Sequence, residues 1–134
     1  MKTEELRRLY IEEKYLKPWT WTSPNATWIW NEDGSIDVIG NIGIGAVDKK
    51  LPFKFRNVYG NFDFNAVDIT TLEGSPDMVQ GYFSCSRCNL KTLGHAPKTV
   101  SKSFYCYDNP GNFTTEDVLK VCKVGGDIKT KGIL

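Results

Sequence analysis

Apolar residues in the middle of the chain recur every 21 positions. Three segments each begin with a valine and carry a Phe-x-Phe or Phe-x-Cys pattern four residues later. The positions that correspond are Val58, Val79 and Val100; Phe62, Phe83 and Phe104; Phe64, Cys85 and Cys106; Ile69 and Leu90; Leu72 and Leu93; and Pro76 and Pro97. A fixed period of this length is typical of a solenoid, in which each coil buries its apolar positions against those of the next coil.

Each unit predicts one short strand with a single buried face. In the segment Phe62-Asp-Phe64 and its copies, apolar residues alternate with polar ones, as in a half-buried strand. Because successive units run in the same direction, we expect a parallel sheet of three or four repeat strands. The additional strand comes from a weaker copy at residues 38–44, which starts 20 residues before the first good unit. Residues 36–111 are therefore expected to form the repeat region of a single α/β domain.

The N-terminal segment predicts an amphipathic helix over residues 3–16. Leu6, Leu9 and Tyr10 mark one of its faces, and Leu16 falls near that face. Pro18 should end the helix, because proline disfavours helical geometry at the residue before it. A helix of this length is not stable alone, so we expect it to dock on the open end of the solenoid.

A tryptophan-rich segment follows this helix. Its members are Trp19, Trp21, Trp28 and Trp30. Two aromatic segments around a turn predict a hairpin or two short strands. One interpretation is that they complete an N-terminal cap over residues 1–35, with one tryptophan left partly exposed. The alternative is an aromatic patch that binds a partner.

Residues 112–134 predict the cap at the other end. Thr114-Thr-Glu-Asp117 matches a capping box, and the glycines at 125 and 126 should end the helix that it begins. Because the third unit lacks the Leu-x-x-Leu portion, we expect this helix to replace it.

The repeat resembles a known class of protein. The pattern Phe-x-Cys-x-x-Asn is complete at Phe104, Cys106 and Asn109, and fuller units continue with Leu-x-x-Leu and Pro. This resembles a short leucine-rich repeat, closest in spacing to the repeats of about 20 to 22 residues in bacterial effector proteins. Val67 and Cys88 stand where the pattern has asparagine, so a continuous asparagine ladder is not expected.

A second resemblance covers roughly residues 28–128. The sequence Val-x-Gly-x-Phe-x-Cys, followed by Leu-x-x-Leu-x-Gly-x-Pro and preceded by Gly34-Ser-Ile-Asp-Val38, resembles repeat proteins of large tailed bacteriophages. This resemblance implies a phage accessory protein that acts in an infected bacterium.

Composition narrows the classes of function. Seventeen basic and sixteen acidic residues leave a formal charge of +1, which does not favour a nucleic acid or a membrane as partner. No apolar run approaches the length of a membrane span, and the start Met1-Lys-Thr-Glu-Glu lacks the apolar region of a signal peptide. We therefore expect a cytoplasmic location.

Cysteine and histidine offer the candidate metal ligands. They are Cys85, Cys88, Cys106, Cys122 and His95, and they could suggest a zinc site. Cys85 and Cys106, however, take the ladder position that Phe64 fills one unit earlier, which favours a role as small buried apolar residues. No nucleophile with a positioned base is evident, so neither a cofactor nor enzyme activity is expected. A small metal-binding protein or enzyme stays as a further alternative.

The strand residues that alternate with the buried ones should line one outer face, where three tyrosines gather. The residues expected to contact a partner are Tyr82, Tyr105, Tyr107, Asp63, Ser84, Ser86, Ser103, Arg87 and Asp108. Tyrosine gives large contact area at a low entropy cost and is enriched in binding surfaces. Alternatively, the tyrosines stabilise one another across the strands.

These observations predict a non-enzymatic protein–protein interaction module. What the phage resemblance implies is a protein that binds a host or phage protein, and that blocks a host enzyme, toxin or defence factor. The alternative from another class is a structural or self-associating protein, either a homo-oligomer or a minor virion component.

Overall fold

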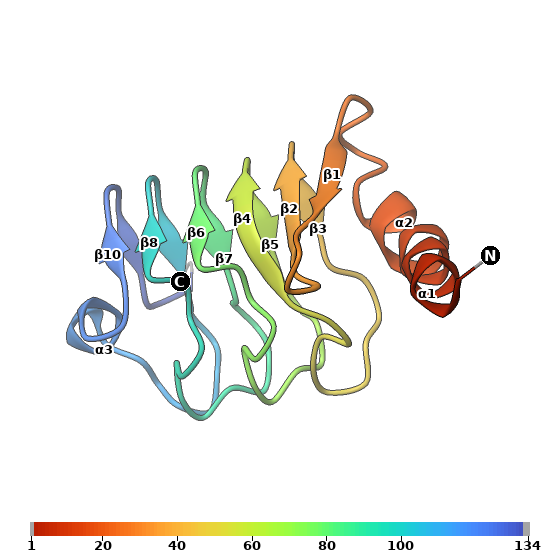
Figure 1. Cartoon of the computed structure of the whole chain (residues 1–134). Helices are drawn as coiled ribbons and strands as arrows, with labels where there is room; N and C mark the ends of the chain where they lie inside the picture. Colours follow the sequence, from red (N-terminus) through yellow and green to blue (C-terminus); the bar gives the residue numbers. More distant parts are fainter. Residues whose placement is uncertain (1, 133–134) are drawn as a thin grey trace.

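The computed structural model describes residues 2–132 and shows a mixed α/β solenoid of about four coils. In Figure 1 the strands of successive coils stand side by side, long loops close the coils below them, and helices lie at both ends. The predicted fold class is confirmed, with its parallel strands, N-terminal helix and small C-terminal helix.

The coils build two sheets, whereas the repeat predicts only one. Sheet A contains, in spatial order, β1 (Thr27–Trp30), β2 (Ile36–Ile39), β4 (Phe55–Tyr59), β6 (Met78–Val79), β8 (Thr99–Val100) and β10 (Lys123–Val124). Sheet B contains β3 (Ile42–Gly43), β5 (Phe62–Asp63), β7 (Phe83–Ser84), β9 (Phe104–Tyr105) and β11 (Ile128–Lys129). Strands β1 and β2 are antiparallel, and the other pairs are parallel. The valines of the repeat thus lie in sheet A and the first phenylalanines in sheet B.

The phenylalanine ladder lies in the interior, as predicted. Phe62 pairs with Phe83, and Phe83 pairs with Phe104, across sheet B. Their ring centroids are 5.8 and 5.1 Å apart, and all three side chains are fully buried. Ile42 pairs with Phe62 in the same register, so the weaker first copy joins the ladder.

The long loops carry the remaining apolar ladder. Its buried members are Ile69, Leu72, Pro76, Leu90, Leu93 and Pro97. The buried Asn109 side chain secures the last of these loops: Nδ2 donates to the Cys85 carbonyl at 2.9 Å, and Oδ1 accepts from the Leu90 amide at 3.1 Å. One coil earlier, Cys88 Sγ lies 3.2 Å from the Phe64 carbonyl oxygen. Cysteine thus makes a weaker version of the asparagine contact.

Glycines line the ridge where the chain passes from sheet A to sheet B. The amide of Gly81 donates to the carbonyl of Gly60 at 2.8 Å. A Cβ atom on Gly60 would lie 2.1 Å from the carbonyl oxygen of Gly40. Glycine is therefore required at position 60 because the backbones of adjacent coils approach too closely for a side chain.

The N-terminal helix runs further than predicted. Helix α1 (Thr3–Ile11) continues through a π-helical turn labelled η1 (Glu12–Leu16) into α2 (Lys17–Trp19). Pro18 lies in the first turn of α2, where a missing N–H group is tolerated. The expectation that this proline ends the helix is therefore wrong.

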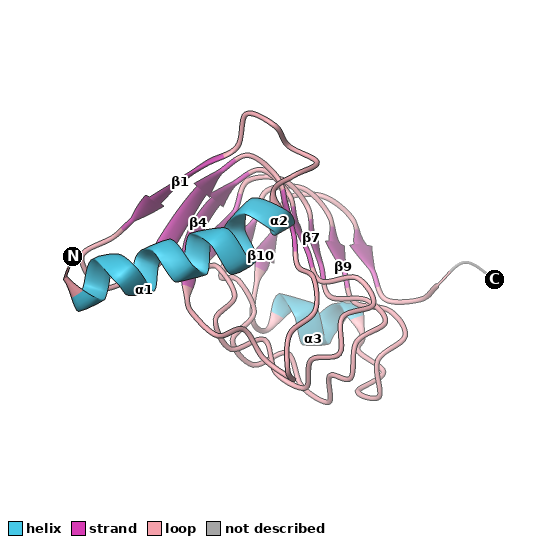
Figure 2. Cartoon of the chain, turned by 90° about the vertical axis from the view of Figure 1, so that its right-hand side faces the viewer, coloured by secondary structure: helices cyan, strands magenta, loops and turns pink. Residues whose placement is uncertain are grey.

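The helix docks through its C-terminal half. Ile11 and Leu16 are buried, whereas the predicted docking residues Leu6, Leu9 and Tyr10 are exposed. Figure 2 looks at the N-terminal end of the solenoid and shows α1 crossing that end below β1. Of the apolar residues that define the helix in the sequence, Leu16 thus packs in the core, whereas the stripe of Leu6, Leu9 and Tyr10 is open to solvent.

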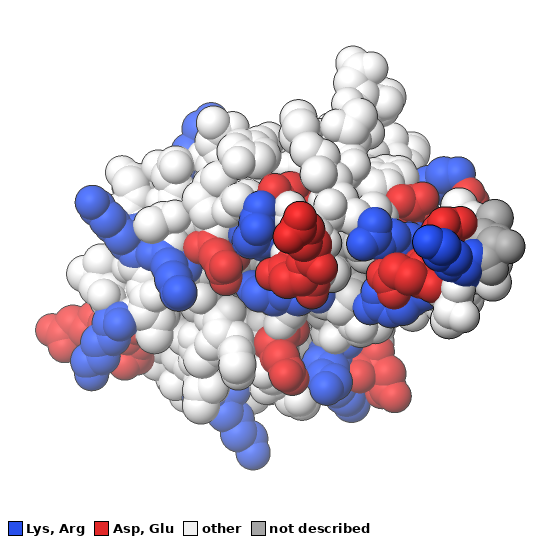
Figure 3. All heavy atoms as spheres, in the orientation of Figure 1, with Lys and Arg blue, Asp and Glu red and all other residues white. Residues whose placement is uncertain are grey.

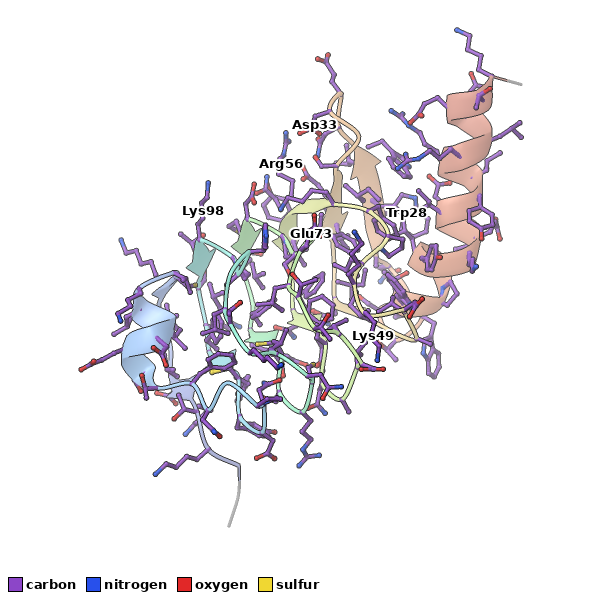
Figure 4. The ribbon with its side chains drawn as sticks, turned by 90° about the horizontal axis from the view of Figure 1, so that it is seen from below. Trp28, Asp33, Lys49, Arg56, Glu73 and Lys98 are labelled. Carbon is purple, nitrogen blue, oxygen red and sulfur yellow. The ribbon has the colours of Figure 1, made fainter. Side chains whose placement is uncertain are left out.

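The tryptophan segment completes the N-terminal cap. Trp19 is buried in α2 and stacks on Phe53, with ring centroids 6.0 Å apart. Trp28 lies between the strands and the N-terminal helix (Figure 4), and Trp30 Nε1 donates to a Glu12 carboxylate oxygen at 2.7 Å. Only one strand forms here, since Trp19 belongs to a helix. Trp21 is 77% exposed, so one tryptophan of the four lies open to solvent, as expected.

The C-terminal segment does more than cap the solenoid. Helix α3 (Thr115–Leu119) begins with the predicted capping box, in which Thr114 and Asp117 exchange backbone and side-chain hydrogen bonds. Beyond it, β10 and β11 pair with β8 and β9 and extend both sheets. The helix therefore replaces the loop of one more coil, and that coil lies where the sequence predicts only a cap.

Candidate binding face

The predicted partner residues lie on the outer face of sheet B. Backbone alternation turns Phe62, Phe83 and Phe104 inward and the residues next to them outward. In the paired register, Asp63 lies beside Ser84, and Ser84 lies beside Tyr105. We call this surface the tyrosine face; it comprises Tyr82, Tyr105, Tyr107, Asp63, Ser103, Arg87 and Asp108.

Two of the tyrosines are fixed against each other. The rings of Tyr82 and Tyr105 meet edge to face, with centroids 5.7 Å apart and an interplanar angle of 89°. The Tyr82 hydroxyl lies 3.4 Å from a carboxylate oxygen of Asp63. Burial, together with the Asp63 charge, raises the pKa of Tyr82, so its hydroxyl keeps its proton as a hydrogen-bond donor. This cross-strand contact is the mutual stabilisation expected as the alternative to binding, yet both rings stay partly exposed.

The third tyrosine lies beside charged groups. The Arg87 guanidinium sits 5.7 Å from the centre of the Tyr107 ring. Arg87 also lies 3.8 Å from Asp108, and both side chains are exposed. The backbones of Arg87 and Asp108 have φ of +57°, a left-handed conformation that is costly for arginine. Arg87 follows Ser86 and Asp108 follows Tyr107, so the two residues occupy the same position in successive coils.

The serines contribute less surface than predicted. Ser84 and Ser86 lie on this side of the sheet but are 6% and 0% exposed. Ser86 Oγ accepts a hydrogen bond from the Tyr107 amide at 3.2 Å. Ser103 is partly exposed, and its Oγ accepts from the Asp127 amide at 3.3 Å. Ser84 and Ser86 therefore support the face from beneath and cannot offer contact area to a partner.

Sheet B also places a basic residue beside the tyrosine face, on a strand that the 21-residue repeat does not predict. Lys129 pairs with Tyr105 across the last two strands, and its side chain is exposed. The valine-to-phenylalanine interval of the repeat recurs as Val124 to Ile128, which could have identified this strand.

The candidate metal ligands do not gather into a site. Among residues 2–132 no group of three His, Cys, Asp or Glu side chains could hold a metal ion. Burial raises the pKa of the Cys85 thiol well above its ordinary value and that of Cys88 and Cys106 to about 11. Because the thiolate is the ligand and the nucleophile, such thiols are poorly suited to either role. His95 is exposed in a loop, with a left-handed φ of +68°.

Apolar side chains are also exposed on the outer face of sheet A. Ile29, Ile39 and Tyr59 are 50%, 46% and 41% exposed. Ile39 pairs with Tyr59 in adjacent parallel strands, and Ile29 lies on the neighbouring strand β1. No pattern in the sequence predicts a role for these residues.

Comparison with protein-family models, with curated proteins and with solved structures gives no match for this chain. No helix within residues 2–132 is long and apolar enough to cross a membrane. The geometry of the faces therefore carries the functional argument.

Proposed function

We propose that this protein is a non-enzymatic binding module that holds another protein against the tyrosine face. The observation that carries the proposal is the cluster of partly exposed tyrosines held on and beside the short, paired strands of sheet B. Tyr82 and Tyr105 support each other, and Tyr107 lies beside Arg87. Side chains already held in place lose little entropy on binding, so such a surface can bind a partner efficiently.

The charge of the face favours a protein partner. Asp63 and Asp108 carry negative charge, and Arg87 and Lys129 carry positive charge, within one surface. A nucleic acid needs a basic stripe that follows its phosphates, and an aspartate beside the central tyrosine pair opposes one. Mixed charge around aromatic residues is typical of protein interfaces.

The setting of this function is suggested by the resemblance to repeat proteins of large tailed bacteriophages. In that setting the partner is a host or phage protein, and binding would block a host enzyme, toxin or defence factor. The protein would then act in the cytoplasm of the infected bacterium.

Affinity capture from a bacterial lysate tests the proposal. The bait is the full chain, compared with a variant that combines Tyr82→Ala, Tyr105→Ala and Tyr107→Ala. The matched control combines Tyr59→Ala, Gln80→Ala and Ser101→Ala. It removes three exposed side chains at the ends of β4, β6 and β8 on the side of sheet A.

We expect the wild type and the sheet A control to retain the same protein and the tyrosine variant to lose it. Circular dichroism of both variants must match the wild type. Equal capture by the tyrosine variant would exclude the tyrosine face as the binding surface.

A further inference from the structure

Strand β1 leaves a free edge at the N-terminal end of sheet A. It is the last strand of the six, and its sequence Thr-Trp-Ile-Trp contains neither a charge nor a proline. In Figure 2, α1 lies below β1, and the free edge of the strand faces the viewer. Natural sheets usually protect such an edge with charges, prolines or a covering segment, because it can pair with another strand.

The backbone groups on this edge can be identified from the register. Asn31 donates its amide hydrogen to Ser35 at 2.8 Å, and β1 and β2 pair as Trp30 with Ile36 and Trp28 with Val38. Because bonded and non-bonded pairs alternate in an antiparallel ladder, the N–H and C=O groups of Trp28 and Trp30 point away from β2. In the described part of the chain, no hydrogen bond from outside the sheet reaches these backbone groups.

Exposed apolar side chains lie on the outer surface near this edge. Ile29 is 50% exposed; its partner on β2 is the buried Asp37, and the exposed Ile39 and Tyr59 lie further along β2 and β4. Figure 3 shows that the upper part of this face, over β1 and the ends of β2 and β4, carries no Lys, Arg, Asp or Glu side chains. The charged side chains form a band lower on the molecule.

We propose that the β1 edge binds the β1 edge of a second copy of this chain, antiparallel and centred on Ile29. In this register Trp28 lies opposite Trp30 of the second copy, and the two residues exchange backbone hydrogen bonds. The reciprocal pair does the same, so every free group of the two tryptophans finds a partner. The two sheets A then join into one continuous sheet.

Self-complementarity is what favours a second copy over an unrelated strand. A two-fold axis beside Ile29 brings the free N–H and C=O groups of Trp28 in one copy against those of Trp30 in the other, and the reverse. The same surface is then used by both copies, as an isologous interface requires. The axis also places the two Ile29 side chains in a non-hydrogen-bonded pair, with Cα atoms about 4.5 Å apart. The exposed strip of each copy, Ile29, Ile39 and Tyr59, then lies on the same outer surface.

The first test measures mass against concentration by light scattering and sedimentation. We expect the wild-type chain to form a dimer, and Ile29→Lys to raise the dissociation constant by about tenfold or more, because like charges then lie directly opposite. The matched control is Leu119→Lys, on an exposed leucine of α3 at the other end of the solenoid. A wild-type monomer at a few hundred micromolar, or an Ile29→Lys variant that dimerises as well as the control, would overturn the proposal.

The second test checks the register through a covalent link. Under mild oxidation, Ile29→Cys should form a disulfide-linked dimer, because Cα atoms about 4.5 Å apart lie within disulfide range. Thr27→Cys is the control: it is exposed on the same face, but the two copies of position 27 would lie about 13 Å apart. Linking of both variants to the same extent, or of Thr27→Cys alone, would contradict the proposed pairing.

Discussion

Phe62 and Phe83 lie 21 residues apart in the chain, yet their rings stack with an interplanar angle of 16° and centroids 5.8 Å apart. Phe104 packs on the other side of Phe83, with centroids 5.1 Å apart and an interplanar angle of 49°. The middle ring is therefore covered by an aromatic ring from the coil on either side. Loss of that ring should affect two coil interfaces at once.

Phe83→Ala should lower the free energy of unfolding by about 3 to 5 kcal/mol, because a fully buried ring leaves a cavity between two coils. Urea denaturation of the purified chain measures this loss. Tyr59→Ala, which removes an exposed ring from sheet A, is the control and should change the stability by less than about 1 kcal/mol. Equal losses would mean that the phenylalanine ladder does not dominate the core.

Gly60→Ala should destabilise the fold by about 2 kcal/mol or more, because its Cβ must displace the Gly40 backbone. Gly43→Ala is the matched control on sheet B, where a Cβ would meet no atom within 4 Å. This control should leave the free energy of unfolding unchanged or raise it by about 0.4 to 1 kcal/mol, because alanine lowers the conformational entropy of the unfolded chain. Thermal melting of the two variants side by side distinguishes them, and a similar melting temperature would refute the close approach of the coils.

Asn109→Ala should cost about 2 to 4 kcal/mol, because it leaves the buried Cys85 carbonyl and the Leu90 amide without their partner. Asn109→Cys should lose less, since Cys88 Sγ already contacts the equivalent carbonyl of Phe64 one coil earlier. Chemical denaturation would give both values. A cysteine variant no more stable than the alanine variant would show that the two coils do not use this position in the same way.

The stability of the protein should fall as the pH rises from about 9 to 11. Burial raises the pKa of Cys88 from 9.0 to about 11. As the pH rises, this thiol therefore loses its proton at a lower pH in the unfolded chain than in the folded one. The unfolded state then binds fewer protons, which lowers the free energy of unfolding with rising pH. Cys88→Val, with the residue found at position 67, should make this decline shallower by up to about 1.4 kcal/mol per pH unit. Denaturation curves at pH 8, 9 and 10 would reveal it, and parallel declines in both proteins would contradict it.

The repeat could be predicted from the sequence because each coil keeps its apolar residues in register. The spacing alone predicts that Val58 pairs with Val79 and that Phe62 pairs with Phe83. The valine ladder and the phenylalanine ladder follow from these pairs. The second sheet could not be predicted in this way, since the sequence does not show that the glycine at 60 or 81 turns the chain between two strands. That turn depends on contact between adjacent backbones.

The buried face of the N-terminal helix and the last coil do not follow from the sequence pattern, for two different physical reasons. The amphipathic pattern of Leu6 and Tyr10 suggests a buried stripe, but a π-helical turn and the docking of Leu16 decide which side faces the core. The last coil spans 24 residues from Val100 to Val124, because α3 replaces a shorter loop, so it falls outside a strict 21-residue search. Of the predicted face, the tyrosines lie where expected, whereas the burial of Ser84 depends on its neighbours' side chains.

The equal length of the central coils has a consequence for how such a protein can grow. Residue 100 occupies the same position in its coil as residue 79 does in the coil before it. A tandem duplication of residues 79–99 would therefore insert one complete coil and keep the register of the chain on both sides. The enlarged molecule would keep both of its caps and gain one row of outward side chains, including a second copy of Tyr82. Gene duplication could in this way widen the contact area stepwise, without any redesign of the interior.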